Sequence, residues 1–216
     1  MFTDSEFSSH SDIEAIINDI KEYINNSSLL TKIQKLTLCY YLSSWKKYFA
    51  ALDDDSKNTD KIIFQQFSLP IIFDFTKHIL YVRFNIDYIN SHLENFETLT
   101  YKDIMNDLKI PPTPDNISSY TRKCLNSGPI ITVNTFFTKN TFLIIDGNHR
   151  FHFVKTDNIL NFPVKNIGYH QLNYKLFNSK FSYAIFLFIN DINIILSEIS
   201  NKRIFYKSII NTLKRL

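Results

Sequence analysis

The chain has 216 residues, of which 44% are hydrophobic and 21% are charged, so we expect a packed core and exclude general disorder. A net charge of +3 is thin support for a nucleic-acid partner, because dedicated binders usually carry a basic stripe. The two cysteines, Cys39 and Cys124, lie far apart without a metal-ligand spacing, so they predict neither a disulfide framework nor a zinc site.

The N-terminal part of the chain is predicted to be helical. Ser11 and Glu14 form a capping-box pattern, and isoleucines recur at helical spacing as far as about residue 24. A second helix is predicted over residues 30–52, again from apolar periodicity. The charged, polar residues 53–58 follow it and mark the first candidate domain boundary.

The next part of the chain combines short strands and short helices. A helix beginning after Thr100 is predicted to stop at the prolines of residues 111–114, since proline cannot continue a helix. The elements predicted here are strands over 71–75 and 79–84, a helical segment over 86–96 and a helix over 101–110.

Clearer signals begin at Thr113. With Thr113 as N-cap, Pro114 at the first helical position and Gly128 beyond the end, a helix is predicted over 114–126. A β-branched strand over 129–134 follows, beginning with a proline. The remaining predicted elements are a hairpin turn at 138–140, a return strand over 141–145, a helix ending near 157, a strand over 162–167 and terminal helices over 175–199 and 202–214.

Between the return strand and the next helix lies the sequence Asp146-Gly147-Asn148-His149-Arg150. It is the one place in the chain where a glycine, a carboxylate, a histidine and an arginine fall within five residues. A glycine lets the backbone bend sharply and lets another group approach closely. The first turn of the following helix presents N–H groups and the positive end of its dipole. The sequence therefore predicts a site for phosphate or another anion.

The order of elements over residues 114–168 resembles the ParB/sulfiredoxin superfamily. The resemblance rests on the Gly-Pro-Ile-Ile-Thr-Val strand at 128–133, the hairpin, the turn at 146–150 and Phe-Pro-Val at 162–164. The turn fits the D-G-x-H-R pattern of ParB-like nuclease and small-molecule kinase relatives. The resemblance implies an α+β fold with a small mixed sheet. We therefore expect a helical N-terminal extension (1–60), a core (61–172) and C-terminal helices packed on that core (173–216).

By this resemblance the turn would bind a nucleotide, ATP or similar, together with Mg²⁺. Backbone N–H groups of Gly147, Asn148 and His149 would cradle phosphate, and the planar guanidinium of Arg150 would clamp it. The residues expected to be catalytic are Asp146, His149 and Arg150. His149 would donate to phosphate or act as an acid or base. Asp146 would hold the metal through water, orient His149 or cap the helix. The implied activity is a nucleotide-dependent phosphotransferase or hydrolase.

Two departures from the family narrow this expectation. Asn148 stands where sulfiredoxins have a cysteine, so sulfinate repair is not expected. Arg150 is a single arginine where chromosome-partitioning proteins carry two, so centromere binding is not expected. The kinase relatives also need a catalytic acid elsewhere in the chain, and Asp87, Glu94 and Glu97 are the candidates.

Several alternatives stay open at this point. One is a ParB-like nuclease or DNA-binding accessory of a bacterial plasmid, phage or defence locus. Another is a non-catalytic interaction module that binds a protein partner through its helical extensions. Asp146 is also a common helix N-cap residue, and His149 with Arg150 would then be a surface pair. His149 and His152, three residues apart, suggest a metal site, and Tyr169 and His170 are further candidates to line the phosphate pocket.

The sequence also bears on location. The polar, acidic N-terminus argues against a signal peptide. The apolar run at residues 183–189 is far shorter than the ~20 residues of a membrane span. We therefore expect a soluble, cytoplasmic protein without a membrane partner.

Overall fold

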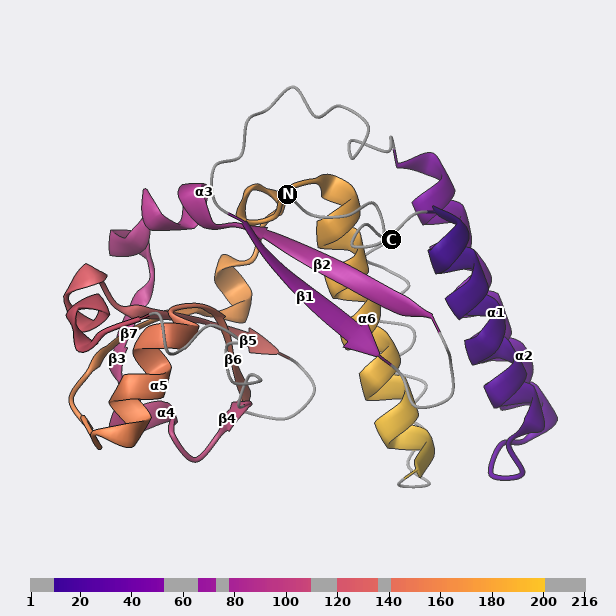
Figure 1. The fold of residues 1–216 in the computed structure, drawn as a ribbon. Coiled ribbons are helices and arrows are strands. Elements are labelled where there is room, and N and C mark those ends of the chain that lie inside the picture. The colour runs from indigo at the N-terminus through magenta and orange to yellow at the C-terminus, as the bar shows by residue number, and fades with distance from the viewer. Residues whose placement is uncertain (1–9, 53–65, 73–77, 110–119, 136–140, 201–216) are drawn as a thin grey trace. The chain divides into compact units, whose positions relative to one another are not determined.

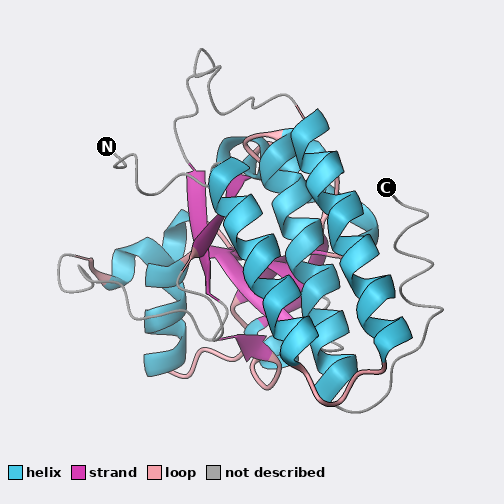
Figure 2. Ribbon diagram, turned by 90° about the vertical axis from the view of Figure 1, so that its right-hand side faces the viewer, coloured by secondary structure: helices cyan, strands magenta, loops and turns pink. Residues whose placement is uncertain are grey.

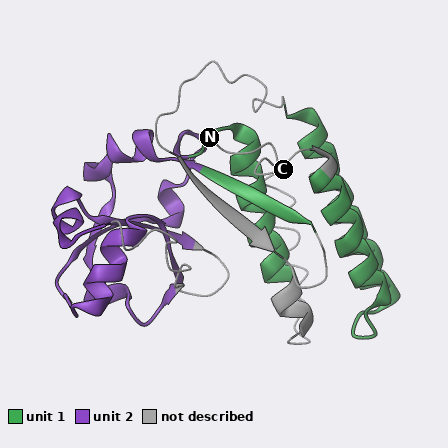
Figure 3. Ribbon diagram, in the orientation of Figure 1, with its two compact units in different colours: residues 1–62, 68–83, 177–216 green, residues 63–67, 84–176 purple. Residues whose placement is uncertain are grey.

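The computed structural model describes residues 10–52, 66–72, 78–109, 120–135 and 141–200. Contacts group the chain into two compact units, which Figure 3 shows in different colours. The first unit comprises residues 1–62, 68–83 and 177–216, and the second comprises 63–67 and 84–176. The C-terminal helix thus groups with the N-terminal helices. The three segments expected from the sequence, with boundaries near residues 60 and 172, stay a prediction.

The first unit is built from long helices and most of a two-stranded sheet (Figure 1). Its elements are α1 (His10–Asn26), α2 (Lys32–Ala51), β1 (Gln66–Ile72), β2 (Ile79–Asn85) and α6 (Lys180–Ser200). Figure 2 shows α1 and α2 lying side by side along their length. Both helices were predicted from apolar periodicity, and the structure confirms them.

Local sequence explains where these helices begin and which face they bury. Thr31 caps α2 through a reciprocal pair of hydrogen bonds: Gln34 N donates to Thr31 Oγ1 (3.3 Å) and Thr31 N donates to Gln34 Oε1 (2.8 Å). On α1, the predicted stripe of isoleucines is buried: Ile13, Ile16, Ile17, Ile20 and Ile24. On α2, by contrast, Ile33, Leu36 and Tyr40 are 68%, 63% and 67% exposed, so its apolar residues occupy two faces.

Trp45 is at the centre of the core of this unit. It is 1% exposed, and its ring centroid lies 5.4 Å from that of Phe49 and 5.4 Å from that of Phe188 on α6. Its indole N–H donates to Tyr41 Oη (2.7 Å), and Tyr41 Oη donates to Asp191 Oδ2 (2.6 Å). The ring buries a large apolar area while its polar atom is satisfied, so α2 and α6 are joined by both packing and hydrogen bonds.

The second unit contains the mixed sheet and the predicted phosphate site. In chain order its elements are α3 (Ile86–Asn90), the 3₁₀ helix η3 (Leu93–Asn95), β3 (Glu97–Thr100), α4 (Tyr101–Ile104), β4 (Leu108–Lys109), the 3₁₀ helix η5 (Arg122–Ser127), β5 (Ile130–Thr135), β6 (Thr141–Asp146), α5 (Asn148–Thr156), β7 (Pro163–Ile167) and the 3₁₀ helices η6 (Tyr169–Gln171) and η7 (Tyr174–Leu176).

The sheet of this unit has the strand order β3-β7-β5-β6-β4. Strand β6 is antiparallel to β5, whereas β7 is parallel to β5 and β4 is parallel to β6. A parallel pair needs a crossover connection, and the chain between β5 and β7 supplies one that includes α5. Phe151 and Val154 of α5 pack on Ile130, Ile144 and Val164 of the three central strands, which fixes the helix on that face.

The structure confirms the α+β class, with a small mixed sheet and several helices. Two predicted elements need correction. The predicted helix over 114–126 is, in its described part, the 3₁₀ helix η5, and residues 110–119 lie outside the described residues. The predicted helix over 101–110 is only one turn, α4, followed by strand β4. The hairpin turn at 138–140 and the helix over 202–214 lie outside the described residues.

Among the helices that the structure describes, none is both long enough and apolar enough to cross a membrane.

Candidate functional site at the turn between β6 and α5

Gly147 allows the chain to pass directly from β6 into α5. It is the N-cap residue of α5 and has φ 92° and ψ 23°, a left-handed conformation that favours glycine. The pairing of β5 with β6 shifts register between Ile131 and Thr132, immediately before this turn. A β-carbon at position 147 would lie 3.0 Å from Arg150 Nε and Nη2 and 3.2 Å from Ile130 Cα. The glycine therefore provides both the backbone angle and the space in which the Arg150 guanidinium lies.

Arg150 folds back over the turn and is held by two partners. Its Nη2 donates to Asp146 Oδ2 (2.8 Å) and its Nη1 donates to Ser127 Oγ (2.9 Å). The Arg150 and Asp146 side chains are 13% and 22% exposed, so this ion pair is largely shielded from solvent. Ser127 in turn donates to the carbonyl of Cys124 (2.7 Å), which fixes its hydroxyl as an acceptor for the arginine. The guanidinium is therefore preorganised beside the N-terminus of α5.

Two polar atoms of the same turn are buried without a hydrogen-bond partner in the described structure. They are Arg150 Nε and Asn148 Oδ1. Buried polar atoms are rarely left unsatisfied, so each such atom calls for an explanation. Arg150 Nε is a donor with positive charge, which suits an anion. The two flipped orientations of the Asn148 side-chain amide have nearly the same shape. One places the oxygen, an acceptor, at the buried position, and the other places the nitrogen, a donor, there.

His149 lies against an aromatic ring from outside the motif. Its ring centroid is 3.6 Å from that of Tyr120, and the two planes are inclined by 15°. Burial of the ring, followed by the positive charge of Arg150, lowers the pKa of His149 below its ordinary value of 6.5, while Asp146 acts in the opposite direction. His149 is therefore mainly neutral at pH 7.

This shift predicts a pH dependence of stability. Because the pKa is lower in the folded state, the unfolded chain takes up the proton first as the pH falls below about 6.5. The stabilisation that neutral His149 adds to the free energy of unfolding should be complete above that pH, and it should be lost as the pH falls through the folded-state pKa. We expect the difference in free energy of unfolding between wild type and His149→Gln to shrink over this window. Denaturant titrations at a series of pH values measure it, and a difference that grows as the pH falls would contradict the assignment.

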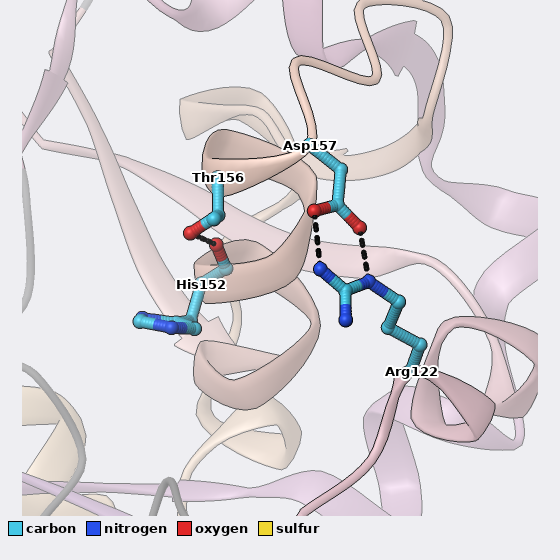
Figure 4. A network of polar contacts seen from close by, with 4 residues as sticks. All are labelled: Arg122, His152, Thr156 and Asp157. Atoms are coloured by element: carbon cyan, nitrogen blue, oxygen red, sulfur yellow. Dashed lines mark hydrogen bonds and ion pairs between the residues drawn. The ribbon is translucent and has the colours of Figure 1, made fainter.

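The segment of residues 120–127 forms the second wall of the site, and it is attached to α5 at three points. Two of them are the Tyr120–His149 stack and the Ser127–Arg150 hydrogen bond. The third is Arg122, whose Nε and Nη2 donate to the two carboxylate oxygens of Asp157 at 2.7 and 2.9 Å, as Figure 4 shows. The Arg122 guanidinium also lies 5.7 Å from the centre of the Phe153 ring. These contacts hold residues 120–127 in place beside the turn.

The residues expected to bind a metal provide at most a partial site. Within the part of the chain that the structure describes, no three histidine, cysteine, aspartate or glutamate residues cluster as metal ligands. His152, the proposed partner of His149 in a metal site, projects from α5 on the side away from the Arg122–Asp157 pair in Figure 4. Asp146 is the one carboxylate in the turn, and Arg150 already binds it. One carboxylate suits Mg²⁺ only where phosphate oxygens and water complete the shell, as in many nucleotide complexes.

The strand directions place several other residues that were predicted to belong to the phosphate site away from the turn. Since β6 is antiparallel to β5 and β7 is parallel to β5, Asp146 and Gly168 lie at opposite ends of the sheet. Tyr169 and His170 follow Gly168, so the structure does not bring them to the turn. Glu97 lies on edge strand β3, three strands from β6, or roughly 14 Å at ~4.8 Å per strand.

Glu97 belongs to a separate polar network on the sheet. The buried Asn166 side chain donates to Asn134 Oδ1 (2.6 Å) and to Glu97 Oε2 (3.3 Å), and accepts from Thr132 Oγ1 (3.1 Å). Glu94 and Asp87 lie on the short helices η3 and α3 that precede β3. None of the three acidic candidates is therefore placed at the turn by this fold.

Sequence reasoning identified the five residues of the turn but missed the residues that contact them. Tyr120 and Ser127 contact the turn, whereas Arg122 contacts Asp157. In this part of the chain the structure has a 3₁₀ helix over Arg122–Ser127 in place of the predicted α-helix. The Asp146–Arg150 ion pair had a readable signal, because residues four apart at a helix start lie on one face. Tyr120 and Ser127 had no such signal.

Comparisons of this chain with models of protein families, with curated proteins and with solved structures found no match.

Proposed function

We propose that the second unit is a ParB/sulfiredoxin-like domain that binds a nucleotide, ATP or similar, with its phosphates at the turn of residues 146–150. The observation that carries the proposal is the Arg150 guanidinium, which lies over Gly147 at the start of α5 with its Nε buried and without a partner. The order of β5, antiparallel β6, the turn, α5 and parallel β7 supports the proposed fold.

Magnitudes indicate which group contributes most to phosphate binding. The N-terminus of a helix stabilises an anion by ~0.3–2 kcal/mol. A hydrogen bond to a charged group contributes ~1.5–3 kcal/mol, and guanidinium can form two with one phosphate. Arg150 is therefore the principal anion-binding residue, and the backbone N–H groups at Gly147 and Asn148 orient the phosphate.

The same geometry supports a requirement for Mg²⁺. Asp146 Oδ2 lies 2.8 Å from Arg150 Nη2, on the same guanidinium whose Nε is assigned to the phosphate, so a bound phosphate would approach this carboxylate. Two negative groups at that distance repel each other unless a cation offsets their charge. Asp146 would hold Mg²⁺ through water, and the ion would supply the positive charge that offsets the phosphate.

The proposed chemistry is transfer of the terminal phosphoryl group of a nucleoside triphosphate to water or to a hydroxyl, with the nucleoside diphosphate as the leaving group. Such transfer relies mainly on positioning and on stabilisation of negative charge, which Arg150 supplies here. His149, neutral at pH 7 because its pKa is lowered, would take the proton from the attacking oxygen.

Arg150→Ala tests the proposal. We expect wild type to bind ATP with Mg²⁺, and the variant to bind it roughly 10- to 100-fold more weakly, the equivalent of one or two charge-assisted hydrogen bonds. Isothermal titration calorimetry with ATP, ADP, CTP and GTP measures the affinities. Lys46→Ala is the control, because it removes one positive charge from a side chain that is paired with Glu14 in the first unit.

Circular dichroism checks that each variant folds. If Arg150→Ala does not fold, Arg150→Lys keeps the charge beside Asp146 but loses the bidentate geometry, and we still expect weaker binding. Absence of nucleotide binding by wild type, or an equal loss in Arg150→Ala and Lys46→Ala, would overturn the proposal.

The two alternative functions stay predictions. DNA binding has only the net charge of +3 in its favour. A protein partner bound through the helical extension has more support, because four apolar or aromatic side chains just before α2 and along its first half are more than half exposed: Leu29, Ile33, Leu36 and Tyr40.

A further inference from the structure

Tyr120 combines exposure with a fixed position, and its ring takes no direct part in the phosphate binding assigned to Arg150. The residue is 40% exposed, although one face of its ring is covered by His149 at a centroid distance of 3.6 Å. An exposed tyrosine alone is ordinary. Tyr120 differs because the ring it covers belongs to the residue next to Arg150.

The neighbouring contacts prevent this ring from moving freely. Two residues further on, Arg122 is held by both carboxylate oxygens of Asp157 (Figure 4), and Ser127 at the end of the same segment is held by Arg150. The backbone on the C-terminal side of Tyr120 is therefore tied to α5. A ring fixed in this way can accept a second flat group with little loss of conformational entropy.

We propose that Tyr120 forms the base-binding subsite of this site, with the nucleobase stacking on the face of the ring opposite His149. This assignment rests on the proposed function, because it takes the phosphates to lie at Arg150. The order of the stack would be base, Tyr120, His149. Stacking on an aromatic ring depends on a π-face that all bases share, so the subsite would distinguish nucleotides from phosphates without a base, but would select weakly among the bases.

The inference identifies the ligand class as free nucleotides rather than aliphatic or inorganic phosphates. The cationic Arg122 and Lys123 lie two and three residues after Tyr120, and His149, on which Tyr120 stacks, is next to Arg150 in the chain. An aromatic surface flanked by cations suits a ligand with a flat base at one end and phosphates at the other.

The test compares ATP with tripolyphosphate, which lacks the base, in the presence of Mg²⁺. We expect Tyr120→Ala and Tyr120→Leu to weaken ATP binding roughly tenfold or more, because leucine keeps apolar bulk but has no π-face. Tyr120→Phe should bind ATP within about twofold of wild type, since it keeps the ring. Tripolyphosphate affinity should be the same in all four proteins. Tyr174→Ala is the matched control, an exposed tyrosine (49%) on η7 at a distance in the chain.

The outcomes separate this inference from the proposed function. If wild type binds neither ligand, the proposed function fails. If wild type binds both and the Tyr120 variants change neither affinity, the phosphate site stands and the base subsite is overturned. If Tyr120→Ala weakens ATP and tripolyphosphate equally, the residue acts through His149 and not on a base. Tighter binding of a 5′-phosphorylated trinucleotide than of ATP would overturn the assignment to free nucleotides.

Discussion

Replacing Trp45 by alanine is expected to lower the free energy of unfolding of the chain by about 3–5 kcal/mol. The side chain is 1% exposed and packs against Phe49 and Phe188, so its removal leaves a large cavity between α2 and α6. The variant also removes the donor that Tyr41 Oη accepts at 2.7 Å. Most single domains have a free energy of unfolding of only about 5–15 kcal/mol, so a loss of this size would remove a large part of the stability of the first unit.

Urea titration followed by circular dichroism measures this effect, since Trp45 is the one tryptophan of the chain and its fluorescence is lost in the variant. Trp45→Phe should fall between wild type and Trp45→Ala, because phenylalanine fills part of the volume but donates no hydrogen bond. Tyr40→Ala is the matched control: it lies on the same helix, is 67% exposed, and should change stability by no more than about 0.5 kcal/mol. Equal losses in Trp45→Ala and Tyr40→Ala would contradict the packing described above.

Gly147→Ala is expected to destabilise the second unit and to weaken phosphate binding at once. The left-handed conformation alone costs a non-glycine residue about 1–2 kcal/mol. The new β-carbon would also lie 3.0 Å from the Arg150 guanidinium and 3.2 Å from the backbone of Ile130. Ile130 Cα cannot move without shifting β5, so the arginine must leave its place beside Asp146 and Ser127. Nucleotide affinity should therefore fall toward that of Arg150→Ala.

Two further variants separate the causes of this effect. Gly147→Asn carries a residue that tolerates the left-handed region better, so it should recover part of the stability while still displacing Arg150. Gly168→Ala is the control with an ordinary backbone, φ −69°, where the new β-carbon meets the exposed side chain of His170 at 2.9 Å. That side chain can rotate, so a small loss is expected. The role given to Gly147 would be contradicted if the Gly147→Ala variant were as stable as the Gly168→Ala variant and bound nucleotide with unchanged affinity.

The long elements and the turn could be predicted from the sequence because their signals are local. The isoleucine stripe of α1 repeats within one helix, and the β-branched residues of β5 alternate within one strand. Gly147 was recognisable as a turn residue because glycine adopts positive φ without steric cost. The α+β class follows from the presence and order of these elements.

The short elements were missed or misassigned because their stability comes from partners elsewhere in the chain. Strand β3 has four residues and exists through its pairing with β7, more than sixty positions later. Strand β4 has two residues and pairs with β6. The Thr100 cap and its hydrogen bonds to Asp103 were readable in the sequence, but the single turn that follows is ended by this strand pairing and not by the later prolines.

By itself, the sequence determined the long helices, the central strands and the five residues of the turn, since periodicity, capping and glycine conformation act over a few residues. The tertiary structure decided which distant groups reach that turn. Ser127 contacts Arg150 across 23 positions, and Tyr41 contacts Asp191 across 150. Such contacts depend on how sheet and helices pack, because side chains far apart in sequence meet only after the backbone has placed them. Tyr120 and Ser127 are therefore visible as parts of the candidate site only in the folded chain.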